Sequence, residues 1–144
     1  MNRIFAKHSR RLESLILLGS RLLLSGLFLH EAVTLTANFD ASAAVMAKLG
    51  VPIPVLAATI AVQGAGGLAI ALGWGARSGA AALGLFCLAT ALLFHTNFAL
   101  RNELLHFEKD FAIAGGMFAL MIRGAGAWSL EGLNRARRRV AAMA

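Results

Sequence analysis

The sequence predicts an all-α protein, an integral membrane four-helix bundle with short loops and one further helix at its outer surface. Two observations support this fold class. Hydrophobic residues make up 58% of the chain and charged residues 15%, whereas a soluble domain keeps about a quarter of its residues charged. The apolar residues also gather in four stretches long enough to cross a bilayer, which takes about 20 helical residues. We therefore expect residues 1–144 to form a single membrane domain.

The predicted spans lie near residues 14–36, 55–76, 79–98 and 107–126. A basic run, MNRIFAKHSRR, precedes the first span and is also typical of the start of a secretory signal peptide. Arg21 interrupts the apolar part, however, and no small-x-small cleavage site follows promptly, so we expect a retained span. Residues 41–49, ASAAVMAKL, are too few to cross and are expected to form a short helix at the outer surface. The ends, residues 1–13 and 127–144, are basic tails.

Positive charges are distributed unevenly between the two ends of these spans. One end carries Arg3, Lys7, Arg10, Arg11, Arg77, Arg135, Arg137, Arg138 and Arg139, and the other carries only Lys48, Arg101 and Lys109. The positive-inside rule then predicts that both termini are cytoplasmic. The net charge of +7 would also suit nucleic-acid binding. Topology already accounts for the basic ends and no nucleic-acid motif accompanies them, so we expect no nucleic-acid partner.

The first span contains two polar residues that are difficult to place in lipid. In LFLHEAVTL, His30 and Glu31 interrupt a run of apolar residues. A line of small residues runs along this helix and includes the histidine. Its members are Gly19, Gly26, His30 and Ala37. Small residues let helices approach closely, so this line is the predicted packing face, with His30 pointing into the bundle and Glu31 at its edge. Arg21 projects almost opposite and is expected to reach the headgroups as an anchor.

The other spans carry polar residues at the same outer end. Gln63 lies over the glycines of the second span, His95 continues a stripe of small residues in the third, and Lys109 and Asp110 enter the fourth. A charge near the bilayer centre costs roughly 3 kcal/mol on insertion scales, so such residues usually pair or face water. We expect Glu31 to pair with Lys109. The alternative is a purely structural role, in which these residues form hydrogen bonds between helices or lie at the outer membrane interface.

Five segments follow one another in this order within residues 15–131: RLLLSGLFLH, KLGVPIP, QGAGGLAIALGWGARSGAAAL, LLFH and FEKDFAIAGGMFAL. Together they resemble the DoxX family of small bacterial membrane proteins. The resemblance implies a four-helix bundle in a bacterial inner membrane. It also implies an association with redox chemistry, because members include a quinone-linked thiosulfate oxidoreductase and part of a mycobacterial membrane oxidoreductase complex.

This chain departs from the family pattern at three positions. Members often carry histidine, glycine and then a lysine in the first span, where this chain has His30, Glu31 and Thr34. They often carry glutamate in the second span, where this chain has Gln63. The carboxylate has moved from the second helix to the first, and the cation is kept only at Lys109.

Our leading functional hypothesis is a redox-associated membrane subunit that binds quinone. The expected catalytic residues are His30, Glu31 and Lys109, and the expected cofactor-binding residues are Gln63, His95 and Asp110. A b-type haem between His30 and His95 is a weaker alternative, and no local ligand spacing supports a metal site. Two other classes stay open: a small transporter, and an accessory or assembly subunit that contacts a redox enzyme or a second copy through its glycine-rich faces.

Overall fold

The computed structural model describes residues 2–143 as six helices. They are α1 (Asn2–Ala37), α2 (Phe39–Lys48), α3 (Ile53–Leu72), α4 (Ala76–Phe94), α5 (Arg101–Arg123) and α6 (Leu130–Ala141). The described part of the chain contains no strand, so the all-α fold class is confirmed. The side chains of residues 1–7, 10 and 144 lie outside the description, and with them the predicted charges of Arg3, Lys7 and Arg10.

Three helices are long and apolar enough to cross a membrane: Arg11–Ala37 within α1, α3 and α4. The fourth predicted span falls in α5, whose first ten residues include five charged ones. Its uninterrupted apolar part, residues 111–122, is about 18 Å long at 1.5 Å per residue, which is shorter than a bilayer core. Three spans therefore follow from length and composition, and the fourth stays a prediction.

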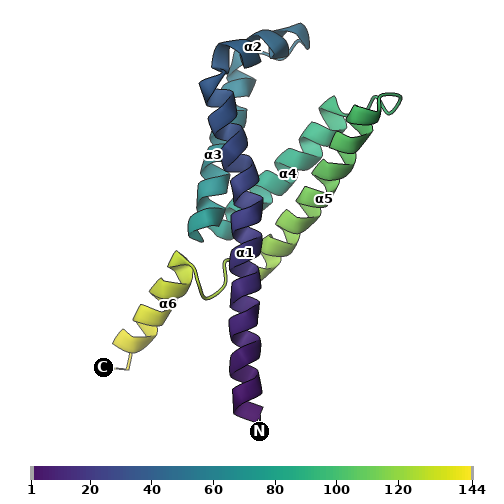
Figure 1. Ribbon diagram of the computed structural model, residues 1–144. Coiled ribbons are helices and arrows are strands. Elements are labelled where there is room, and N and C mark those ends of the chain that lie inside the picture. The colour runs from purple at the N-terminus through teal and green to yellow at the C-terminus, as the bar shows by residue number, and fades with distance from the viewer. Residues whose placement is uncertain (1, 144) are drawn as a thin grey trace.

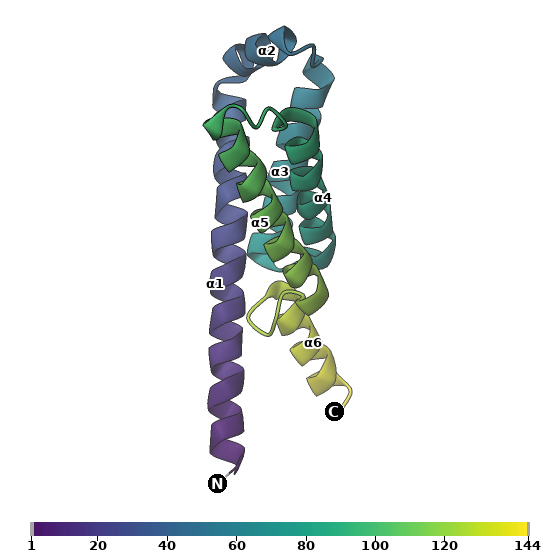
Figure 2. The same ribbon diagram turned by 90° about the vertical axis from the view of Figure 1, so that its right-hand side faces the viewer.

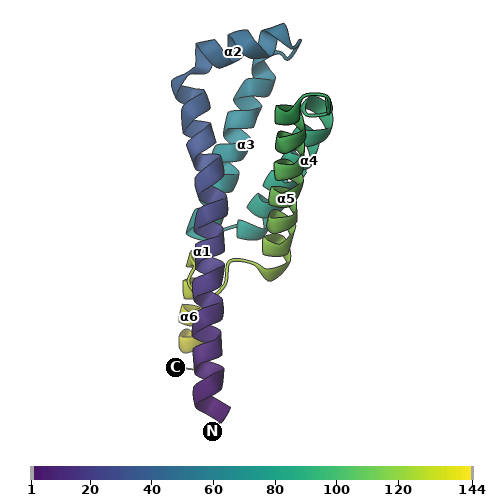
Figure 3. The same cartoon turned by 45° about the vertical axis from the view of Figure 1, so that its right-hand side comes forward.

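The helices pack as two pairs, α1 with α3 and α4 with α5, and the pairs meet where α3 contacts α4 (Figures 1 and 3). Glycines on α3 allow these close approaches. A Cβ atom on Gly66 would stand 2.8 Å from Leu83 Cγ, and one on Gly67 would stand 2.9 Å from Leu29 Cγ. The core between the pairs contains Phe28, Ile70, Ala80, Leu83, Cys87, Ala114, Met117 and Leu120.

The predicted packing face of α1 is wrong. The residues buried along α1 are Arg21, Ser25, Phe28 and Ala32, which recur every three or four positions. His30 is exposed, and a Cβ atom on Gly19 or Gly26 would have open space around it. The physical reason is that α3 supplies the glycines at the α1–α3 contact and α1 supplies the larger side chains, Leu29 among them.

The prediction that Arg21 reaches the headgroups is also wrong, because its side chain is only 1% exposed. Its guanidinium donates four hydrogen bonds to backbone carbonyls. Nε bonds to Ile70 at 2.9 Å, Nη2 to Ala71 at 2.7 Å, and Nη1 to both Ala125 and Trp128 at 2.8 Å. The last carbonyls of a helix lack intrahelical partners, so the end of α3 attracts a multiple donor. Arg21 thereby joins α1, α3 and the α5–α6 linker.

The bundle has two distinct ends (Figure 2). At one, which we call the α2 end, α2 lies across the tips of α1 and α3, and the loop between α4 and α5 points toward the same end. The other, which we call the terminal end, carries the α3–α4 turn, α6 and both chain termini. The predicted short helix near 41–49 is confirmed as α2. Residues 127–144 are predicted only as a basic tail, but they contain the helix α6. This helix begins after Ser129, whose Oγ accepts a hydrogen bond from Gly132 N at 3.0 Å.

Candidate functional site

A cavity of about 470 Å³ lies in the half of the bundle next to the α2 end, between α1, α3, α4 and α5. Its volume falls within the range of about 300–1,000 Å³ that is typical of small-molecule sites. Of the six predicted site residues, five line it: Glu31, Gln63, His95, Lys109 and Asp110. The rings of Phe28 and Phe86 also line the cavity, so its wall combines polar groups with aromatic surface.

His30 does not line this cavity, although the next residue, Glu31, does. The side chain of His30 is exposed on another part of the α1 surface. His30 and His95 therefore do not line this cavity together. Among the described residues, no group of three or more His, Cys, Asp or Glu side chains could hold a metal ion.

The side chain of Gln63 is the least satisfied polar group of the cavity. It is only 4% exposed, and its Oε1 atom has no hydrogen-bond partner among residues 2–143. A buried acceptor without a partner costs about 1–3 kcal/mol. A ligand that donates a hydrogen bond to this oxygen would recover that cost.

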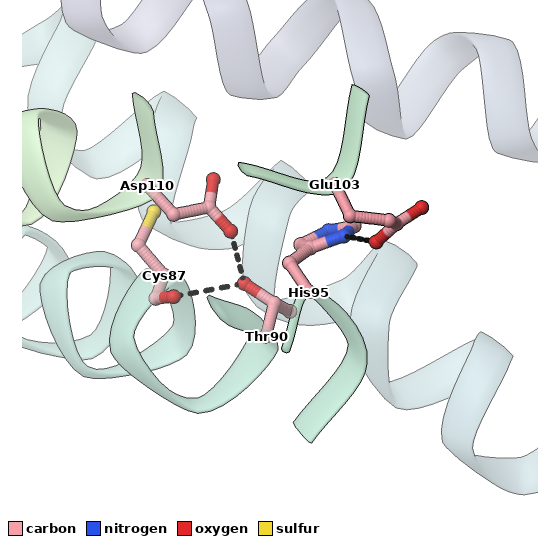
Figure 4. Close-up of polar contacts among 5 residues, drawn as sticks. All are labelled: Cys87, Thr90, His95, Glu103 and Asp110. Atoms are coloured by element: carbon pink, nitrogen blue, oxygen red, sulfur yellow. Dashed lines mark hydrogen bonds and ion pairs between the residues drawn. The ribbon is translucent and has the colours of Figure 1, made fainter. Parts of the chain in front are cut away.

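Thr90 and Asp110 form a hydrogen-bonded pair between α4 and α5 (Figure 4). Thr90 Oγ1 lies 2.8 Å from Asp110 Oδ2, and also 2.9 Å and 3.1 Å from the carbonyl oxygens of Cys87 and Phe86. A hydroxyl has one proton, so it cannot donate to all three acceptors at once. It therefore donates either to Asp110, which joins α4 to α5, or to a carbonyl of its own helix.

A second polar group stands at the mouth of the cavity, where α4 ends and α5 begins. His95 Nδ1 lies 2.8 Å from Glu103 Oε2 (Figure 4), and the His95 ring stacks on His106 with 5.0 Å between ring centroids. The sequence analysis missed Thr90, Glu103 and His106. Two of them could have been found, because Glu103, His106 and Asp110 recur at helical spacing on one face of α5.

The predicted ion pair between Glu31 and Lys109 is not formed in the described part of the chain. Both side chains line the cavity from opposite helix pairs and both are exposed. Neither side chain is buried, so neither depends on a direct contact with the other. The expectation failed because it assumed that the outer half of the bundle is closed around them.

A neighbouring hollow of about 560 Å³ lies between the α2–α3 loop, α3 and α4. It shares Phe86, Thr90 and His95 with the cavity. These side chains therefore stand between two hollows, one on each side of α4.

An all-helical membrane protein with several spanning helices and a polar cavity between its helix pairs is the class that this structure defines. The DoxX family model matches residues 16–96, and the chain belongs to the DoxX family. It is 36% identical over 124 residues to the inner membrane protein YqjF of Escherichia coli, which covers 86% of this chain and 95% of that protein. It is 37% identical over 101 residues to the inner membrane protein YphA of the same organism, covering 65% and 72%. No solved structure matches the chain.

Proposed function

We propose that this chain is a multi-pass protein of the bacterial inner membrane and the quinone-binding subunit of a redox system. The location follows the two relatives, which are named inner membrane proteins. The redox role rests on the family resemblance together with the cavity. The observation that carries it is Gln63 Oε1, a buried acceptor without a partner on a side chain that lines a cavity of suitable size.

The cavity offers the groups that a quinone ring needs. Gln63 Oε1 would accept from the hydroxyl of the reduced ring, and the Lys109 ammonium would donate to a carbonyl of the oxidised ring. Phe28 and Phe86 provide apolar contact for the ring itself. A bound quinone supplies the exchange of two electrons with two protons. In this proposal a partner redox subunit exchanges the electrons.

The acidic groups of the cavity would serve as proton carriers. Asp110 accepts a hydrogen bond from Thr90 at 2.8 Å, and Glu31 lines the same cavity from α1. A carboxylate beside the reacting ring is a suitable general base or acid, because it can take up and return a proton. His30 is omitted from the proposed site because it does not line the cavity.

Substitution of Gln63 by methionine tests this proposal. Gln63→Met removes the unpartnered oxygen, so the melting temperature of the ligand-free protein in detergent should rise. The same change should weaken binding of decylubiquinol by at least about fivefold, the equivalent of one hydrogen bond of about 1 kcal/mol. Opposite effects on stability and binding are the expected result, measured by thermal unfolding and by equilibrium binding to the extracted protein.

Two threonines provide a matched control. Thr90 and Thr36 both donate to a carbonyl four residues earlier, but only Thr90 lines the cavity. Thr90→Val should weaken quinol binding, and Thr36→Val should leave it unchanged. If the parent protein binds no quinol, or if Gln63→Met binds it as tightly as the parent, the quinone proposal is wrong.

The exposed face of α1 favours a second candidate, an accessory subunit without chemistry of its own. Gly19, Gly26 and His30 share this face, and a Cβ atom on either glycine would meet nothing within 4 Å. Small residues and one polar side chain on a spanning helix suit contact with another membrane helix. Co-purification of a redox enzyme that is lost in His30→Leu, with no quinol binding by the parent, would support this candidate. The transporter alternative has less support, since the core and Arg21 fill the half of the bundle next to the terminal end.

A further inference from the structure

A basic pocket of about 560 Å³ lies at the terminal end of the bundle, on the side of α6. Its wall combines the end of α5, the linker that follows and one face of α6. The lining residues are Arg123, Gly126, Ala127, Gly132, Arg135, Ala136 and Arg139. The four from α6 lie at positions i, i+3, i+4 and i+7, so they form a single face of that helix.

An apolar groove of about 400 Å³ lies next to the basic pocket, between α1 and α5. Leu17, Leu24 and Leu120 are among the side chains that line it, and Gly116 forms part of its floor. A Cβ atom on Gly116 would stand 3.7 Å from Leu24, so this glycine contributes to the width of the groove. Arg123 lines both hollows. A basic pocket and an apolar groove therefore meet at one arginine.

The charges around the basic pocket are only partly balanced by the protein. Arg123 forms an ion pair with Glu13 of α1. Arg135 Nε donates to the backbone carbonyl of Glu131 at 3.3 Å, which leaves its charge without a carboxylate. Arg139 is exposed and forms no ion pair among the described residues. Three guanidinium groups thus face one carboxylate, and the excess positive charge favours an anion.

The surroundings of the pocket are those of a membrane interface. Trp128 in the linker is 48% exposed, and the apolar side of α6 exposes Leu130 and Leu133. Tryptophan is enriched where membrane meets water, and a helix with basic and apolar faces lies at the same level. An occupant of the basic pocket would therefore be at headgroup depth, and an occupant of the groove would be at acyl-chain depth.

We propose that the two hollows together form a binding site for an anionic phospholipid. Arg135 and Arg139 hold the phosphate together with Arg123, because guanidinium groups bind phosphate oxygens through paired N–H donors. One acyl chain of the same lipid lies in the groove between α1 and α5. Glu13 competes with the phosphate for Arg123, so it weakens binding. The site is separate from the cavity near the α2 end and does not depend on the function proposed for it.

Quenching of tryptophan fluorescence by brominated lipid tests the proposal. The chain has two tryptophans, so Trp74→Phe leaves Trp128 as the only reporter, next to the pocket. Brominated dioleoylphosphatidylglycerol, added to the full chain in detergent, should quench Trp128 at lower concentration than brominated dioleoylphosphatidylcholine. In Arg135→Gln/Arg139→Gln the half-quenching concentration should rise about 25-fold, at about fivefold per arginine. Glu13→Gln should lower it.

The neighbouring pair Arg137→Gln/Arg138→Gln is the matched control, since it removes the same charge from the same helix outside the pocket. It should change the half-quenching concentration by less than about threefold, a general surface effect. Equal shifts in the two double variants would overturn the site, and so would equal quenching by the two lipids. If inorganic phosphate alone raises the melting temperature as much as phosphatidylglycerol does, the pocket binds a free anion and the lipid proposal fails. Helical circular dichroism confirms that each variant is folded.

Discussion

At the scale of single residues, Arg21 of α1 shows how the carboxyl end of a neighbouring transmembrane helix, α3, can accommodate a buried charge. Its guanidinium makes four hydrogen bonds to carbonyl groups and is 1% exposed. Gly73 ends α3 with φ 67°, and a Cβ atom there would stand 2.8 Å from Arg21 Nη2. Glycine is therefore required both by the left-handed backbone and by the arginine. The carbonyl end of a helix carries partial negative charge, which favours a cation at this place.

Arg21→Lys should destabilise the protein by about 2–4 kcal/mol, because an ammonium group cannot reach carbonyls on both α3 and the α5–α6 linker. The expected loss appears as a lower unfolding temperature in detergent. Arg101→Lys is the matched control, since Arg101 is exposed at the start of α5. It should unfold at nearly the parental temperature. Equal stability of the parent and Arg21→Lys would show that the four bonds contribute little.

The sequence located most of the polar cavity residues but not their orientation. Glu31, Gln63 and Asp110 were identified as polar residues within apolar spans, because such residues are costly in lipid and usually pair or face a cavity. The same criterion also selected His30, which the structure leaves exposed on α1. Adjacent positions on a helix point in different directions, and the sequence does not say which face meets a neighbour. The position of the neighbouring helix α3 determines which face of α1 is buried.

At the scale of elements, the glycines of this chain serve two different purposes. On α3, Gly67 receives the side chain of Leu29 from α1. On α1, Gly26 meets nothing within 4 Å. Both positions look alike in sequence, since each is a glycine within a predicted span. The positions of α3 and α4 were predictable from hydrophobicity to within about four residues, but which glycines make a contact depends on the partner helix.

Gly67→Ala should destabilise the protein by about 1–3 kcal/mol, because the added Cβ atom would lie 2.9 Å from Leu29 Cγ. Gly26→Ala is the matched control and should be neutral or stabilising by up to about 1 kcal/mol, since alanine favours the helix and has space there. Unfolding in detergent measures both changes. If Gly26→Ala is the more damaging of the two, α1 packs in the protein by the face that holds Gly26, and the arrangement in Figure 1 is incorrect.

At the scale of the whole molecule, the two ends of the bundle differ in chemistry. The α2 end contains the cavity with its carboxylates, amide and imidazoles. The terminal end contains the buried Arg21, the basic pocket and the exposed arginines of α6. This polarity agrees with the distribution of Lys and Arg in the sequence. It also agrees with a membrane orientation in which the basic end lies in the cytoplasm.

The membrane topology of the chain depends on whether α5 crosses the bilayer. Reporter fusions after Ala141 and in the α3–α4 turn should both lie in the cytoplasm, and fusions at Gly50 or Thr96 should lie outside. If the α3–α4 turn and the C-terminus are both cytoplasmic, α4 leads out of the cytoplasm and α5 must cross the bilayer back into it. The apolar part of α5 is nevertheless only about 18 Å long. Its charged first turns can still cross, because Lys109 and Asp110 line the cavity between the helices.

The C-terminal fusion therefore decides the number of spans. Alkaline phosphatase, which is active only outside, and green fluorescent protein, which is fluorescent only in the cytoplasm, report each position independently. An external C-terminus with an internal α3–α4 turn would mean that α5 enters the bilayer and returns on the same side. The cavity would then open at a re-entrant segment. A reversed pattern at all four positions would keep four spans and refute the orientation drawn from the basic residues.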